Sequence, residues 1–88
     1  PAVLQRVESL NDALDPGKAR EAIALLGTIG GVLVKGSEDH IWAQFLRAEA
    51  HAVLDQEQHV CTVLATIQAR SDDATRNGRI DRLRQACP

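Results

Sequence analysis

Aromatic residues are nearly absent from this sequence, which has no tyrosine and only Trp42 and Phe45. Since β-rich domains draw on aromatic and β-branched side chains, the shortage favours helices. Hydrophobic residues make up 44% of the chain and charged residues 25%, a composition too apolar for a disordered segment. The 88 residues are expected to form one small domain, 1–88.

A large excess of charge and a long apolar run are missing as well. The net charge of −2 gives no field that would attract a nucleic acid or an anionic membrane surface. The longest uncharged run, Ala22 to Val34, is too short to span a bilayer, so we expect no membrane insertion. No secretory signal is visible, and the chain begins at Pro1. We therefore expect a fragment of a larger protein of bacterial type.

Apolar residues spaced three and four apart predict short amphipathic helices in the first half of the chain. The first is expected to end at the Asp15-Pro16-Gly17 turn, and the second to begin near Lys18. Gly27, Gly30 and Gly31 each weaken this second helix by about 1 kcal/mol relative to alanine. We expect another helix to approach their bare surface closely, rather than a break in the helix.

The third predicted helix begins after Ser37, a good N-cap, and continues to about Leu54. It is apolar apart from one narrow polar stripe, so it should be the central helix of the domain. A fourth helix and, after a polar turn, a fifth complete the chain. The polar stripe of the third helix consists of His40, Gln44, Arg47 and His51. The residues expected in the core include Leu26, Phe45, Leu46, Val60, Leu64 and Leu83.

The apolar pattern repeats when the chain is shifted by about 38 residues. Val7 then falls on Phe45, Leu26 falls on Leu64, and the turn at Gly17 falls on Asp55. A fixed-period similarity over helix–turn–helix units is typical of stacked helical hairpins.

Gly17, Ala22, Leu26 and Ile29 have the spacing of the turn glycine, the small residue and the apolar residues of a tetratricopeptide repeat. Over about 4–70 the chain resembles that family. The resemblance implies an all-α fold with two stacked antiparallel helical hairpins, about 2–35 and 37–70, in a right-handed array. A capping helix at about 74–87 would close the array. It also implies a protein or peptide partner and no chemistry.

Residues that could support catalysis or metal binding lack the required spacing. His40 and His51 are eleven residues apart, about 16 Å along a helix, whereas two ligands on one helix sit three or four residues apart. Cys61 lies beside an apolar stripe, without the setting that activates a thiolate. We therefore predict no catalytic residue, no metal, no cofactor and no enzyme activity.

Cys61 and Cys87 lie on or beside the apolar stripes of the fourth and fifth helices, so we predict a disulfide between them. In an antiparallel pair residue 83, not 87, is level with residue 61. The mismatch of four residues is about 6 Å, so the bridge needs a tilted helix or a frayed end near Cys87. A disulfide favours an extracytoplasmic location, periplasmic or secreted. Two reduced thiols are the alternative.

The function expected from these features is a non-enzymatic protein–protein interaction or scaffold module. The partner would bind along the first helix of each hairpin, with Trp42, Arg47, Glu49 and His51 as candidate contacts. For Trp42, its overlay on Leu4 in the repeat favours the core over an interface. The alternative is a structural dimerisation or capping domain attached to a catalytic domain, and a homodimer is possible in that reading. The arginines of the fifth helix are expected to form a solvated face with local ion pairs, with an acidic protein or a lipid as the alternative partner.

Overall fold

The computed structural model describes residues 2–87, and these residues form five α-helices and no strand. The predicted all-α class is confirmed. No helix in this part of the chain is long and apolar enough to cross a membrane. The helices are α1 (Ala2–Asp12), α2 (Pro16–Ile29), α3 (Glu38–Val53), α4 (Glu57–Ala65) and α5 (Ala74–Arg84).

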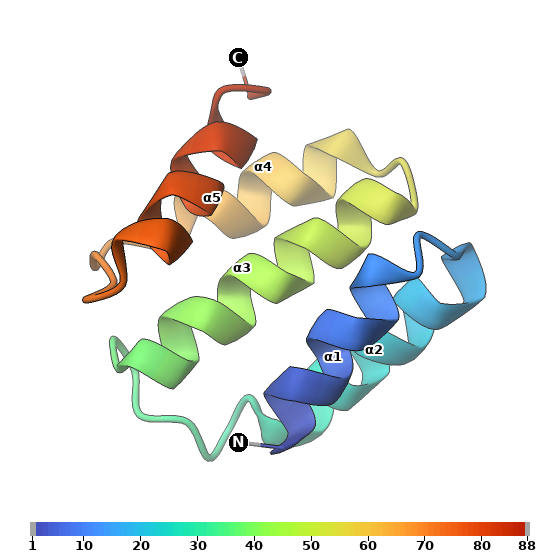
Figure 1. Ribbon diagram of the computed structural model, residues 1–88, viewed down its shortest axis with the longest axis horizontal. Helices are drawn as coiled ribbons and strands as arrows, with labels where there is room; N and C mark the ends of the chain where they lie inside the picture. Colours follow the sequence, from blue (N-terminus) through green and yellow to red (C-terminus); the bar gives the residue numbers. More distant parts are fainter. Residues whose placement is uncertain (1, 88) are drawn as a thin grey trace.

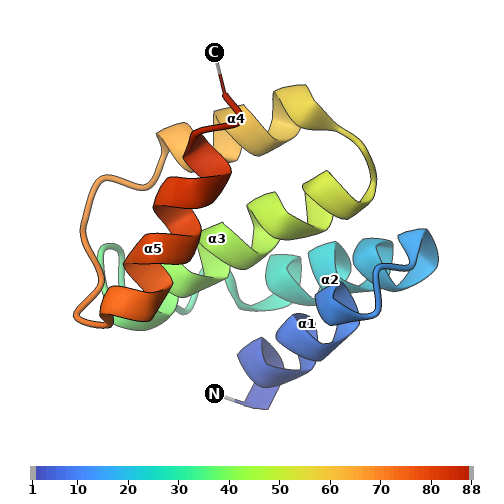
Figure 2. The same ribbon diagram turned by 45° about the horizontal axis from the view of Figure 1, so that its top comes forward.

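Helix α3 lies at the centre and contacts each of the other four helices (Figure 1). Helices α1 and α2 pack against each other on one side of it, and α4 packs on the other side. Helix α5 crosses in front of α3 and reaches α4 with its C-terminal end (Figure 2). The central position predicted for the third helix, from its single polar stripe, is therefore confirmed.

The helix starts follow from side-chain caps. The Asp15 carboxylate accepts a hydrogen bond from the Lys18 amide at 2.9 Å, and Pro16 stands at the start of α2, where its missing N–H costs nothing. The Ser37 hydroxyl caps α3 at the His40 amide, at 3.2 Å. The Asp73 carboxylate caps α5. These three turns thus fix where α2, α3 and α5 begin, whereas α4 starts after Gln56 without a side-chain cap.

The two turns between paired helices share a conformation. Leu14 and Asp55 each adopt a left-handed backbone, with φ of 53° and 59°. They lie 41 residues apart, and so do the helix starts Pro16 and Glu57. The turns therefore correspond at an offset three residues longer than the 38 of the apolar pattern. The repeat itself stays a prediction.

The core lies where α3 meets its neighbours. Five of the six residues predicted for it are no more than 4% exposed, and Leu83 is the exception, because it is half-buried at the edge of α5. Asn11 is 1% exposed, and its side-chain amide donates to the Leu46 carbonyl at 2.9 Å. Trp42 is 3% exposed and stacks on Phe45, with ring centroids 4.8 Å apart. Trp42 therefore lies in the core, as one of its two sequence-based interpretations predicted.

Three helices end earlier than predicted. Helix α2 ends at Ile29, and a Cβ atom added at Gly27 or Gly31 would meet no atom within 4 Å. The expected close approach of another helix was therefore wrong: Gly27 lies inside α2 with open space beside it, and Gly30 is the C-cap at which the helix ends. Helix α4 ends at Ala65, where the Arg84 guanidinium bonds the Leu64 and Ile67 carbonyls. Helix α5 ends at Arg84.

Candidate functional site

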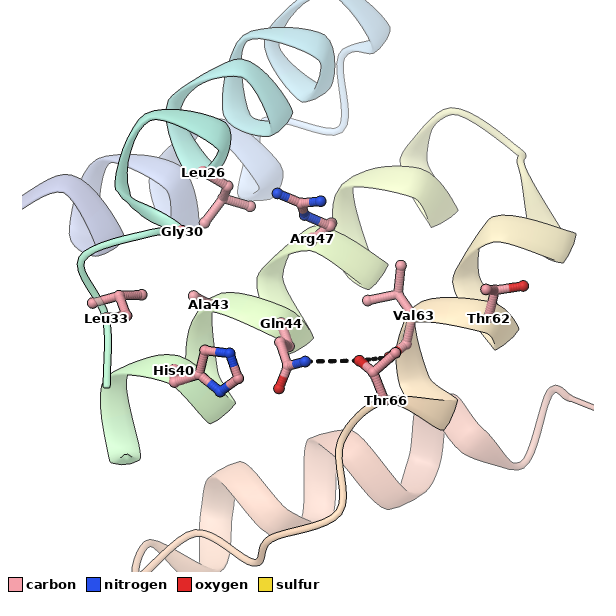
Figure 3. Close-up of a pocket in the computed structure, with 10 residues that line it drawn as sticks. All are labelled: Leu26, Gly30, Leu33, His40, Ala43, Gln44, Arg47, Thr62, Val63 and Thr66. Carbon is pink, nitrogen blue, oxygen red and sulfur yellow. Dashed lines mark hydrogen bonds between the residues drawn. The ribbon is translucent and has the colours of Figure 1, made fainter. Parts of the chain in front are cut away.

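A groove of about 330 Å³ runs along α3 between α2 and α4 (Figure 3). Its walls come from the C-terminal part of α2, from the loop after it, and from one face each of α3 and α4. Apolar side chains and polar side chains alternate along it. The lining residues are Leu26, Gly30, Leu33, His40, Ala43, Gln44, Arg47, Thr62, Val63 and Thr66.

Hydrogen bonds order the polar side chains at the α4 side and at the loop end of the groove. The Gln44 amide donates to the Thr66 hydroxyl at 2.7 Å, and that hydroxyl donates to the Val63 carbonyl at 2.6 Å (Figure 3). The Gly36 amide donates to Nδ1 of His40 at 3.1 Å. Gly36 has φ of +82°, which glycine adopts without strain. This hydrogen bond from the loop therefore fixes the orientation of the His40 ring.

Arg47 is half-buried and extends from α3 toward Leu26 of α2 (Figure 3). Its guanidinium forms no ion pair with any residue in 2–87. No carboxylate lines the groove either. Beyond His40 the groove continues into a smaller recess lined in part by Lys35. The lining thus combines apolar and neutral polar residues with one positive charge, that of Arg47.

The four predicted contact residues do not share one surface. Arg47 lies in the groove. His51 lies farther along α3, where its ring stacks on His59 of α4 at 5.0 Å between centroids. Glu49 lies on the opposite side of α3, and Trp42 is buried beneath α5. Only Arg47, with the other stripe residues His40 and Gln44, forms the open site.

The face of α3 opposite the groove is covered by α5 through arginine contacts. The Arg79 guanidinium bridges Glu49 at 2.7 Å and Glu8 at 3.2 Å, and lies 5.1 Å from the Trp42 ring centroid. Burial alone would lower the pKa of Arg79, but the two carboxylates raise it above its ordinary value. Helix α5 is therefore tied to both α1 and α3. The expectation of a solvated face with local ion pairs was wrong for Arg79, which is half-buried and pairs with carboxylates of other helices. It holds for Asp81 of α5, which pairs with Arg70 and Arg84.

The Glu38 carboxylate, at the start of α3, accepts a second set of hydrogen bonds. The Ser71 hydroxyl donates to it at 2.6 Å, Arg76 at 2.8 Å, and the Asp72 amide at 3.0 Å. These hydrogen bonds, that of Ser71 first, hold the pKa of Glu38 below its ordinary value. The Arg76 guanidinium also lies 4.6 Å from the Trp42 ring centroid. The linker before α5 is thus fixed to the start of α3.

The predicted disulfide between Cys61 and Cys87 is present, with Cα atoms 5.7 Å apart. The expected four-residue mismatch is resolved because α5 ends at Arg84, so the chain leaves the helix before Cys87. The bridge ties the end of the described chain to the middle of α4. It therefore holds α5 at its C-terminal end, while the Glu38 contacts hold it at the other.

Sequence reasoning missed the part of the groove that lies outside α3. Val63 and Thr66 on α4, and Leu33 in the loop, line it beside Leu26, which was assigned only to the core. The spacing of His40, Gln44 and Arg47 on one stripe was the available signal. Within residues 2–87, no group of three or more histidine, cysteine, aspartate or glutamate side chains is arranged to hold a metal ion.

Comparison with models of protein families, with curated proteins and with solved structures finds no match.

Proposed function

We propose that the chain is a non-enzymatic interaction module that binds a segment of a protein partner in the groove along α3. The observation that carries this proposal is the groove itself, in which apolar positions of three helices lie beside polar side chains, chiefly those of the α3 stripe. Recognition sites combine such walls with a few placed polar side chains. The resemblance to tetratricopeptide repeats supports the same reading, since stacked helical hairpins present extended binding surfaces.

Two further expectations belong to this proposal. The helices form two hairpins in a right-handed array capped by α5, which the packing of α1 on α2 and of α3 on α4 supports. The location is extracytoplasmic, periplasmic or secreted, which the Cys61–Cys87 disulfide supports because such bonds persist outside the reducing cytoplasm.

Selection of short random peptides displayed on phage, against the oxidised protein, tests the proposal. Thr66→Phe places a ring in the groove from an exposed position and is expected to abolish binding of the selected peptides. Thr28→Phe is the matched control: Thr28 is also exposed, on α2, and its hydroxyl also bonds a carbonyl three residues back, at 2.6 Å. Peptides that bind Thr66→Phe as well as the parent protein would contradict a role for the groove.

The alternative function, a dimerisation or capping domain, is favoured by one observation. Val32 and Val34, in the loop after α2, are 78% and 74% exposed. A homodimer packed through this loop would bury both side chains. Sedimentation equilibrium then shows a dimer that the double variant Val32→Ser/Val34→Ser converts to a monomer, whereas a monomer at every concentration rejects the dimer.

A further inference from the structure

The charge of the groove is opposite to that of the chain. The protein has 12 acidic residues against 10 basic ones, yet no carboxylate lines the groove, while Arg47 does and Lys35 borders its continuation. In a partly enclosed site lined by apolar groups, such an imbalance is screened less than on an open surface. The groove therefore attracts an anionic group.

Arg47 differs from the other half-buried arginines in the partners of its guanidinium. The other half-buried arginines, Arg76, Arg79 and Arg84, each contact a carboxylate or a backbone carbonyl. Arg47 has no such partner within residues 2–87. A guanidinium carries five N–H donors in a planar fork that matches a carboxylate. A ligand carboxylate would therefore supply the partner that the Arg47 guanidinium lacks within residues 2–87.

His40 and Gln44 add neutral donors on the same side of the groove. Because Nδ1 of His40 accepts the Gly36 amide, the neutral ring carries its proton on Nε2. Gln44 uses one amide N–H on Thr66 and has a second to offer. Both Thr62 and Thr66 donate their hydroxyl protons to carbonyls of α4. The donors available to a ligand thus come from the polar stripe of α3.

We propose that the groove binds an acidic–apolar peptide segment, with an aspartate or glutamate side chain paired to Arg47 and a neighbouring apolar side chain on the floor formed by Leu26, Ala43 and Val63. This inference rests on the proposed function and specifies the chemistry of the partner. A protein segment fits better than a nucleic acid, because within residues 2–87 no Phe, Tyr or Trp side chain lines the groove for base stacking. The net charge of −2 opposes a polyanion.

The test uses the selected peptides, synthesised with amidated C-termini so that only side-chain carboxylates remain. We expect them to contain Asp or Glu beside an apolar residue, and Asp→Asn or Glu→Gln in the peptide to weaken binding at least about tenfold in fluorescence polarisation. Arg47→Gln is expected to cause a similar loss. The matched control is Arg20→Gln, because Arg20 is exposed on α2 and does not line the groove.

Each outcome decides a separate point. Peptides that Thr66→Phe abolishes but that carry no acid, or that bind Arg47→Gln unchanged, overturn the acidic partner and leave the groove function standing. Peptides unaffected by Thr66→Phe, or a selection that yields none, overturn both. Loss of binding on amidation alone would assign the acid to a chain terminus and reject the side-chain carboxylate. An oligonucleotide that displaces the peptide and binds more tightly rejects a protein partner.

Discussion

Breaking the Cys61–Cys87 disulfide is expected to release α5 from α3 before the rest of the domain unfolds. Only Ile80 of α5 is fully buried, at 2% exposure. The remaining attachments are the packing of half-buried Leu83, hydrogen bonds to Glu38 and from Arg84 to two carbonyls, and arginine contacts with partly exposed carboxylates. Such ion pairs contribute about 0–1 kcal/mol each. The covalent bridge is therefore the main constraint on this helix.

The size of the effect follows from the loop that the bridge closes. Cys61 and Cys87 are separated by 26 residues, and the loop-entropy model assigns a cross-link of that span about 3.5 kcal/mol. A domain of this size has a free energy of unfolding of about 5–15 kcal/mol. Reduction should therefore remove a quarter or more of the stability. Cys61→Ser/Cys87→Ser should lose a similar amount.

Trp42 makes the release directly measurable, because it is the only tryptophan and lies beneath Arg76 and Arg79. With a dithiol reductant, its fluorescence should become easier to quench with acrylamide at urea concentrations that leave most of the far-UV circular dichroism intact. The oxidised protein is the control. A reduced protein with the same urea midpoint and the same quenching would refute the reasoning that the bridge holds α5 in place.

Three further predictions concern single side chains. Leu64→Ala should cost about 2–5 kcal/mol in urea unfolding, while Leu14→Ala, at a 76% exposed position, should cost under about 0.5 kcal/mol; equal midpoints would contradict the core placement. Arg79→Ala should raise the acrylamide quenching of Trp42 in the reduced protein, and added salt should reproduce much of that rise in the parent; no change in either would reject the Arg79 contacts. Because the pKa of Glu38 is lowered from 4.5, its contribution is present above that pH and is lost as the pH falls through the folded value. Glu38→Gln should therefore be less stable than the parent at neutral pH and lose less stability on acidification, and parallel pH profiles would contradict this.

The helices and most of the core could be predicted because both depend on local periodicity. Leu26 and Leu64 recur at helical spacing among apolar neighbours, and both are 2% exposed. The caps at Asp15, Ser37 and Asp73 are local as well, since each side chain bonds an amide two or three residues away. Sequence reasoning works where the partner of a residue lies within one turn of it.

Helix ends were harder to predict because they depend on what lies outside the helix. Gly27 is tolerated inside α2, while Gly30 caps its end, although both are glycines in one apolar run. Helix α4 ends where Arg84, from α5, bonds the Leu64 carbonyl near the helix end and the Ile67 carbonyl just after it. No pattern within α4 indicates that contact. Leu83, predicted in the core, is half-buried at the edge of α5. Its burial likewise depends on how distant segments pack, which the local pattern does not show.

The predicted contact residues were divided for a similar reason. Glu49 is two residues after Arg47, so helix geometry directs the two side chains differently. Which of them stays open depends on α5, whose Arg79 reaches Glu49 from 30 residues away in the sequence. The sequence shows both charges but not which one is already paired.

The two sides of α3 carry charges of opposite sign. The proposed function and the predicted release of α5 can therefore be tested independently. One side presents Glu38 and Glu49 to the arginines of α5 and is filled by the chain itself. The other presents Arg47 to the groove, which no carboxylate among residues 2–87 lines. Spacing along the helix places these residues on opposite faces, so Arg47→Gln should leave the fluorescence of Trp42 unchanged. A partner that binds Arg47 therefore contacts a face of α3 that neither α5 nor the disulfide covers.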